Sequence, residues 1–257
     1  MNPMIETFGA LVGKAAAKSP DRARRLLEAA FYASNFQAKH FPSRKLTTAR
    51  AFISPVCMDA VLHPLAHPER SAIVNLFLPC EILHAMRIEP QIAEGLSCYF
   101  SGAGSEQYFI EYARQKGVPD TLCSYHKILT GIALSGVLPK PRLIANTTLA
   151  CDANTNTFRR IAAHYGVPHF TVDTPCADDA DAVQYVADQL RELARFTEEA
   201  MHERFSEDAL RAVLACEQRS MQACRSYYDL LADRYLPNEM TSEMYTLFAT
   251  HILLGKP

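Results

Sequence analysis

Residues 142–173 read RLIANTTLACDANTNTFRRIAAHYGVPHFTVD, and this stretch decides the fold class. Its first part, 142–149, has the length and apolar composition of a buried strand. Residues 155–165 have the spacing of a helix that Gly166 ends, and 169–173 read as a second strand. A strand, a helix of about a dozen residues and another strand predict a βαβ unit with parallel strands.

The same alternation continues toward the N-terminus. Residues 71–78 (SAIVNLFL) predict a fully buried strand, and a helical stretch starts at Cys80. Residues 91–100 predict a further strand, whereas 105–116 and 124–135 predict two helices. Repeated strand–helix units indicate an α/β fold, in which helices flank a parallel sheet.

Both ends of the chain are predicted to be helical. Residues 4–39 predict one or two helices, because Ser-Pro-Asp at 19–21 is a helix start signal. The C-terminal part predicts three further helices, over 179–203, 206–235 and 241–253. We therefore expect three parts: an N-terminal helical segment (1–45), an α/β domain (46–178) and a helical connector (179–257).

Composition excludes several classes of protein. The 257 residues include 26 Lys and Arg against 28 Asp and Glu, well mixed along the chain, so no basic stripe for nucleic acid is expected. No stretch reaches the roughly 20 apolar residues of a membrane span, and the opening residues do not form a secretory signal. A cytoplasmic location is expected, where the eight cysteines would be thiols or metal ligands rather than disulfides.

Three of these cysteines stand at predicted element ends. Cys80 and Cys151 closely follow predicted buried strands, and Cys123 begins a predicted helix. Ligands bind beyond the carboxyl ends of strands in open α/β sheets, and a helix N-terminus favours a thiolate. The three thiols could therefore converge on one site. The alternative is that they are small buried hydrophobic residues, the usual state of a free cysteine.

Polar residues beside these cysteines are further candidates. Glu81, next to Cys80, is a candidate contact to substrate, or simply an acid that the helix dipole favours in the first turn. Residues 154–156 (Asn-Thr-Asn) follow Cys151 and would either donate hydrogen bonds to a bound group or cap the helix that starts there.

A second set of metal-ligating types occurs in PVCMDAVLHPLAHP at 55–68. The spacing of His63 and His67 after Cys57 suits a helix, but we expect Pro64 and Pro68 to break any helix that would aim both rings together.

The remaining cysteines are expected to be structural or exposed. Cys98 lies in a predicted strand, and Cys216 and Cys224 lie on or beside an apolar helix stripe, which favours packing roles. Cys176 is expected in an exposed loop. The chain contains no C-x-x-C pair, no glycine-rich nucleotide loop and no G-x-S-x-G elbow, so zinc-ribbon, P-loop and hydrolase functions lack their residues.

Three stretches resemble the 2-hydroxyacyl-CoA dehydratase and benzoyl-CoA reductase family: LPCEILHAMRIEP (78–90), LCSYHKILTG (122–131) and LIANTTLACDANTNTFRRIAAHYGVPHFTVDTP (143–175). The similarity runs from about residue 70 onward. The resemblance implies a Rossmann-like (flavodoxin-like) sheet in each of two α/β domains per subunit, with an iron–sulfur cluster between them. The chain would contain the first domain and the connector to a second domain that it lacks, and on its own it is expected to be inactive and to bind a cluster weakly or not at all.

The resemblance also implies site residues. Matched by motif, Cys123 and Cys151 would be two ligands of a [4Fe-4S] cluster, and a third family ligand has no counterpart here. Cys80 is a candidate for that third ligand. Related sequences often carry Pro-Glu-Glu where this chain has Pro-Cys-Glu, so the thiol of Cys80 would be a local variation of this chain. Glu81 would contact the substrate.

The implied activity is that of a lyase. A low-potential cluster would deliver one electron to the thioester carbonyl of a 2-hydroxyacyl-CoA, and the resulting ketyl radical anion would expel the hydroxyl group to give an enoyl-CoA. The expected partners are a homologous subunit and a separate ATP-hydrolysing activator, while no nucleic acid or membrane is expected.

Three other functions remain open from the sequence. A reductase of the same superfamily could use a larger or double cluster, with Cys57, Cys80 and Cys98 as extra ligands. The chain could instead be a non-catalytic subunit that pairs with a cluster-bearing partner. A plain α/β domain would keep Cys123 and Cys151 apart, with both thiols in apolar packing.

Overall fold

The computed structural model describes residues 2–234 and 240–252. Its sheet has four strands, β1 (Ser71–Val74), β2 (Glu89–Ile92), β3 (Leu143–Thr147) and β4 (His169–Val172). All neighbours pair in parallel, in the order β2-β1-β3-β4. This order is that of a flavodoxin-like sheet, so the prediction of an α/β, Rossmann-like fold is confirmed.

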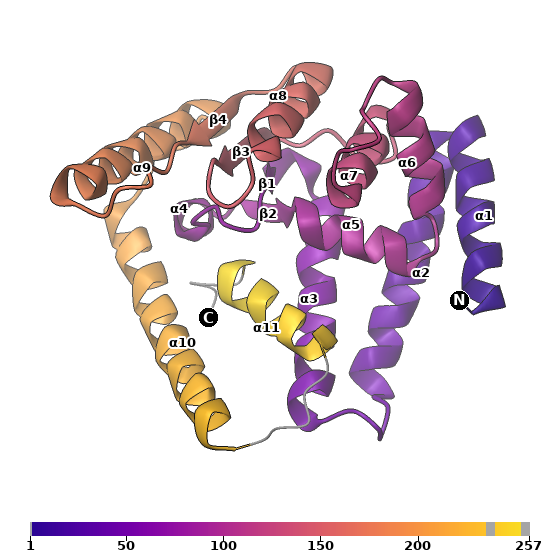
Figure 1. The fold of residues 1–257 in the computed structure, drawn as a ribbon, viewed down its shortest axis with the longest axis horizontal. Helices are drawn as coiled ribbons and strands as arrows, with labels where there is room; N and C mark the ends of the chain where they lie inside the picture. The colour runs from indigo at the N-terminus through magenta and orange to yellow at the C-terminus, as the bar shows by residue number, and fades with distance from the viewer. Residues whose placement is uncertain (1, 235–239, 253–257) are drawn as a thin grey trace.

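Helices surround this sheet (Figure 1). In chain order they are α1 (Pro3–Lys18), α2 (Pro20–His40), α3 (Thr48–Ala66), α4 (Glu81–Ala85), α5 (Ala93–Gly102), α6 (Glu106–Gln115), α7 (Ser124–Leu134), α8 (Ala153–Tyr165), α9 (Ala180–Met201), α10 (Glu207–Asp233) and α11 (Met240–Ile252), with a short 3₁₀ turn at Pro68–Arg70. The prediction of three helices after the α/β part is confirmed. The domain limits at 45 and 178 stay a prediction.

The core has two parts because side chains alternate across the sheet. Ile73 and Ile144 face a cluster built with α1, α2 and α5 to α8. Ala72, Val74 and Leu143 face the other cluster, which is built with α4, α9 and α11. Since both faces are covered, β1 and β3 are buried along their whole length.

The predicted strand over 91–100 is wrong. Strand β2 ends at Ile92, and α5 follows at once. The buried residues Ala93, Leu96 and Phe100 are three and four residues apart, which is the spacing of one helix face. Cys98 therefore lies on a helix and not in a strand.

The expectation that prolines break the helix around His63 is also wrong. Helix α3 continues through Pro64 to Ala66 and contains Pro55 as well. Pro64 lies so near the end that it removes only one late hydrogen bond, and it is itself buried beside Leu62 and Leu65. This packing compensates for the lost bond.

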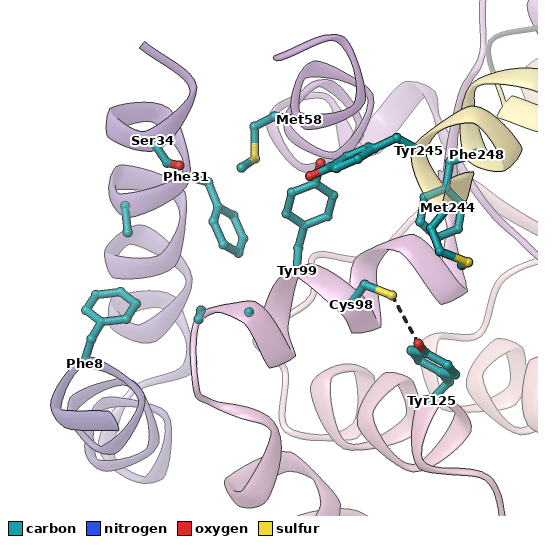
Figure 2. A pocket seen from close by; sticks show the side chains of 13 residues that line it. Phe8, Phe31, Ser34, Met58, Cys98, Tyr99, Tyr125, Met244, Tyr245 and Phe248 are labelled. Atoms are coloured by element: carbon teal, nitrogen blue, oxygen red, sulfur yellow. Dashed lines mark hydrogen bonds between the residues drawn. The ribbon is translucent and has the colours of Figure 1, made fainter. Parts of the chain in front are cut away.

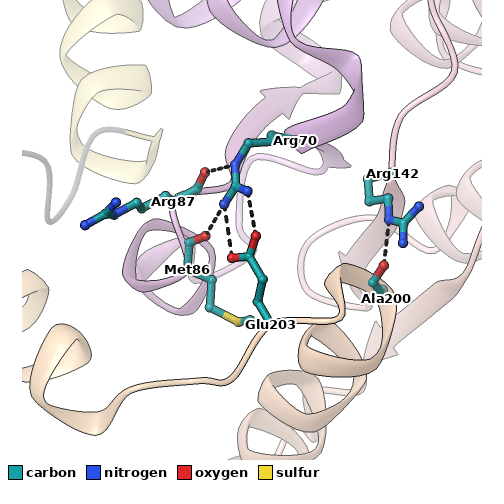
Figure 3. Close-up of polar contacts among 6 residues, drawn as sticks. All are labelled: Arg70, Met86, Arg87, Arg142, Ala200 and Glu203. Carbon is teal, nitrogen blue, oxygen red and sulfur yellow. Dashed lines mark hydrogen bonds and ion pairs between the residues drawn. The ribbon is translucent and has the colours of Figure 1, made fainter.

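The three C-terminal helices are attached to the sheet unevenly. Two arginines hold the C-terminal end of α9 (Figure 3). Arg70 pairs with Glu203 (2.7 Å) and also donates a hydrogen bond to the carbonyl oxygen of Met86. The Nε of Arg142 donates a hydrogen bond to the carbonyl oxygen of Ala200. Helix α10 has no buried residue and runs away from the sheet, whereas α11 returns to contact α3 (Figure 1). In the described part of the chain, no helix combines the length and apolarity needed to cross a membrane.

Candidate functional site

The strand order places a topological switch point at the carboxyl ends of β1 and β3. The chain leaves β1 toward β2 on one side and leaves β3 toward β4 on the other, and ligands bind at such a switch point. Two hydrogen bonds join the strand ends here: Asn75 Nδ2 donates to Thr147 Oγ1 (3.0 Å), and the Thr147 N–H donates to Asn75 Oδ1 (2.9 Å). Both residues are buried, so these two hydrogen bonds hold the ends of β1 and β3 together.

Cys151 lies in the loop after β3. The loop turns sharply at Ala150, whose φ of 67° is uncommon for a residue other than glycine. The half-buried Cys151 stands just before α8, and its carbonyl oxygen accepts a hydrogen bond from the Asn154 N–H (3.1 Å). Its Sγ lies 3.4 Å from Nε2 of His126 in the first turn of α7. Burial lowers the pKa of His126, which favours a neutral imidazole.

Cys123 is the N-cap residue of that same helix. Its side chain is exposed, and its carbonyl oxygen accepts the first helical hydrogen bond from the Lys127 N–H (3.1 Å). Cys151 therefore packs against a helix that Cys123 begins, and both thiols stand beside helix N-termini. The exposed thiol of Cys123 does not fit a core role.

Cys80 and Glu81 lie elsewhere in the packing. Cys80 is buried, and its thiol faces the Leu78 carbonyl oxygen at 3.3 Å. Glu81 begins α4 and lines a cavity of about 640 Å³ that α9 and α10 enclose. Burial, and then the nearby carboxylate of Glu217, raise the pKa of Glu81 to about 7. Its contact with substrate stays a prediction.

A comparison with protein families shows to which family this chain belongs. The family model described as 2-hydroxyglutaryl-CoA dehydratase, D-component, matches residues 75–257. The chain belongs to this family. The match begins at the carboxyl end of β1 and contains both Cys123 and Cys151. The description as a component implies an enzyme with more than one kind of subunit. Comparison with curated proteins gave no match.

The residues around Cys123 and Cys151 can be compared with what an iron–sulfur cluster requires. Cys123 and Cys151 provide two free thiols at helix N-termini, where thiolates are favoured. Helix α8, which begins two residues after Cys151, has no side-chain cap on its first turn. Within residues 2–234 and 240–252, no three His, Cys, Asp or Glu side chains form a metal-binding group. The residues therefore fit part of a cluster site, which needs a further ligand.

The other metal-ligating candidates are not brought together. Cys57 is buried, and burial raises the pKa of its thiol to about 12. His63 and His67 are both exposed, and His67 lies 3.6 Å from Glu69. Cys98 is half-buried, with its Sγ 3.5 Å from the Tyr125 hydroxyl (Figure 2). No observation favours a larger cluster that would use Cys57 and Cys98.

Glu94 is a residue of this region that the sequence did not reveal. It lies in the first turn of α5, and its carboxylate accepts a hydrogen bond from the Leu76 N–H (3.0 Å) in the loop after β1. Burial raises its pKa to about 7. An acid directly after a strand was the available signal, but it was hidden by the assignment of 91–100 to one strand.

Proposed function

We propose that this chain provides Cys123 and Cys151 as thiolate ligands of a [4Fe-4S] cluster in a dehydratase that removes water from a 2-hydroxyacyl-CoA. The contact between Cys151 and the first turn of α7, which Cys123 begins, carries the proposal. It is supported by the position of Cys151 at the switch point and by the family match. A further ligand would come from outside this pair, and the second α/β domain implied by the resemblance would supply it.

The chain's own groups would prepare the two thiolates. The N-termini of α7 and α8 place partial positive charge beside Cys123 and Cys151, which lowers the cost of deprotonating them. The neutral His126 can donate from Nε2 to the Cys151 sulfur, and hydrogen bonds to sulfur are among the factors that set a cluster's potential. The Asn75–Thr147 bonds keep the strand ends from moving as ligands bind.

The bound cluster would supply a single low-potential electron for reduction of the thioester carbonyl. A separate ATP-hydrolysing activator would provide that electron, and a homologous subunit would complete the enzyme in the cytoplasm. The residues described above would hold and shield the group, and residues 154–156 would donate hydrogen bonds toward it.

The test is anaerobic reconstitution, with iron and sulfide, of this chain joined to the second α/β domain that would supply the further ligand, followed by measurement of both elements per chain. We expect Cys123→Ser and Cys151→Ser to lower the iron content strongly compared with the parent protein. Cys176→Ser is the matched control, because Cys176 is also a free, exposed cysteine but lies in the loop after β4. Iron content that is unchanged in both site variants, or lowered equally by Cys176→Ser, would refute the proposal.

A further inference from the structure

An apolar cavity of about 690 Å³ opens beside α7 (Figure 2). Side chains from six helices line it: Phe8 of α1, Phe31 of α2, Met58 of α3, Tyr99 of α5, Tyr125 of α7 and Phe248 of α11. This volume is typical of cavities that bury a small organic ligand. In Figure 2 the Phe31 ring, the Tyr99 ring and the Met58 thioether lie around one common space, and Tyr125 lies beside Cys98.

The lining is uncharged. Among the described residues that form the wall, there is no Lys, Arg, His, Asp or Glu. The two polar groups Cys98 and Tyr125 face each other, with 3.5 Å between the Cys98 Sγ and the Tyr125 hydroxyl, and burial raises the pKa of the Cys98 thiol. Arg50 packs over the face of the Tyr245 ring, 3.9 Å from its centroid, and does not line the cavity.

Tyr125 joins this cavity to the cysteine site. It lies in the first turn of α7, two residues after Cys123 and directly before His126, and it forms part of the cavity wall. A molecule with its reactive end near the cysteines could therefore extend past Tyr125 into the cavity.

We propose that this cavity binds the acyl chain of the acyl-CoA substrate and selects an uncharged aliphatic or aromatic chain over a dicarboxylic one. The inference rests on the proposed function and deepens it by naming the substrate class. A glutaryl group would place its distal carboxylate in a wall without a cation, and burying an unpaired carboxylate is strongly unfavourable. Each methylene of an aliphatic chain gains affinity there, by about fourfold.

The test is isothermal titration calorimetry of the 257-residue chain with octanoyl-CoA, butyryl-CoA, glutaryl-CoA and free coenzyme A. Octanoyl-CoA should bind on the order of 100-fold more tightly than butyryl-CoA, because four more methylenes are buried. Glutaryl-CoA should bind no more tightly than free coenzyme A. Octanoyl and butyryl affinities within a factor of three of each other would overturn the inference, as would glutaryl binding equal to octanoyl binding or no binding of octanoyl-CoA at all.

Two variants locate the bound chain. Ala30 lines the cavity on α2, so Ala30→Phe should weaken octanoyl-CoA binding at least tenfold. Ala29→Phe is the control, since Ala29 is the exposed neighbour on the same helix. Gly102→Leu is a second filling variant, because a Cβ at Gly102 meets nothing within 4 Å. Circular dichroism checks that each variant is folded, and equal octanoyl affinity in a folded filling variant and in Ala29→Phe would overturn the assignment.

The outcomes separate this inference from the proposed cluster function. Acyl binding is measured without iron, so chain-length selectivity can be present in a protein that fails the reconstitution test. Conversely, cysteine-dependent iron binding without chain-length selectivity leaves the cluster proposal intact and removes the acyl pocket.

Discussion

Replacing Glu94 by Gln is expected to make the protein more stable at pH 8 while changing its stability little at pH 5. The Glu94 carboxylate is buried at the start of α5, and burial raises its pKa from 4.5 to about 7. A glutamine carbonyl oxygen can still accept the hydrogen bond from the Leu76 N–H. The substitution therefore removes the ionisation and keeps the contact.

The sign and size of the effect follow from proton linkage. Between pH 4.5 and 7 the folded protein holds a proton on Glu94 that the unfolded chain has lost, so stability falls as the pH rises. The stabilisation from this group is complete below pH 4.5 and is lost as the pH rises through 7. At about 1.4 kcal/mol per pH unit, the loss across this window is roughly 3 kcal/mol. The Glu94→Gln protein does not undergo this loss.

The assay is urea unfolding of the parent and Glu94→Gln proteins at pH 5 and pH 8. The difference in unfolding free energy between the two proteins should shift by roughly 3 kcal/mol in favour of Glu94→Gln between these pH values. Glu199→Gln, at an exposed position on α9, is the control and should show no such shift. A difference that is the same at both pH values would show that Glu94 titrates normally and would refute the reasoning.

Changes at other positions test the packing and the exposure of thiols. Gly131→Ala would push a Cβ into a backbone carbonyl of α6 and should lower the unfolding free energy, measured by thermal unfolding, by about 3 kcal/mol or more. The control Gly102→Ala should lower it by under about 1 kcal/mol, because a Cβ there meets no atom within 4 Å. Equal losses in the two variants would contradict the close approach of α6 and α7. In the native protein at pH 8, iodoacetamide should modify the exposed Cys176 and leave the buried Cys57 unmodified, as measured by mass spectrometry. Rapid labelling of Cys57 would show that its thiol is not buried. Arg70→Lys should lower the urea midpoint of unfolding slightly at low salt and less at high salt, because it loses the forked pairing with Glu203 just after α9. An unchanged midpoint at low salt would show that this pairing does not hold the end of the helix.

The sheet and most helices could be predicted because their signals are local. The βαβ unit at 142–173 contains a buried strand, a helix that Gly166 ends with φ of 59°, and a second strand, and the structure has all three. The segment 91–100 failed because a short apolar run fits a strand or a buried helix equally well. Helix α3 was missed because Pro55 and Pro64 oppose a helix locally, whereas its buried face, which includes Val61, Leu62 and Leu65, packs in tertiary contacts that the local sequence does not reveal.

The site could be predicted only in part for the same physical reason. The prediction that Cys151 follows a buried strand is confirmed, because it lies in the loop between β3 and α8, but the sequence did not show which helix packs against that loop. The contact between Cys151 and His126 joins residues 25 positions apart and depends on how α7 and α8 pack. The rule that ligands gather at carboxyl ends of strands grouped Cys80 with the other two cysteines, whereas its thiol faces the Leu78 carbonyl in the core.

The family match includes the cysteines proposed to bind the cluster but not all of the residues that line the apolar cavity. The matched residues, 75–257, contain the strand-end loops and both cysteines proposed to bind the cluster. Three of the residues that line the apolar cavity, Phe8, Phe31 and Met58, lie instead in helices that precede the matched residues. Cluster chemistry imposes strict geometry on its ligands, whereas an apolar wall accepts any side chains of suitable volume. On the proposal that this cavity binds the acyl chain, substitutions in α1, α2 and α3 would change the acyl-chain selectivity while the cysteines proposed to bind the cluster stay the same.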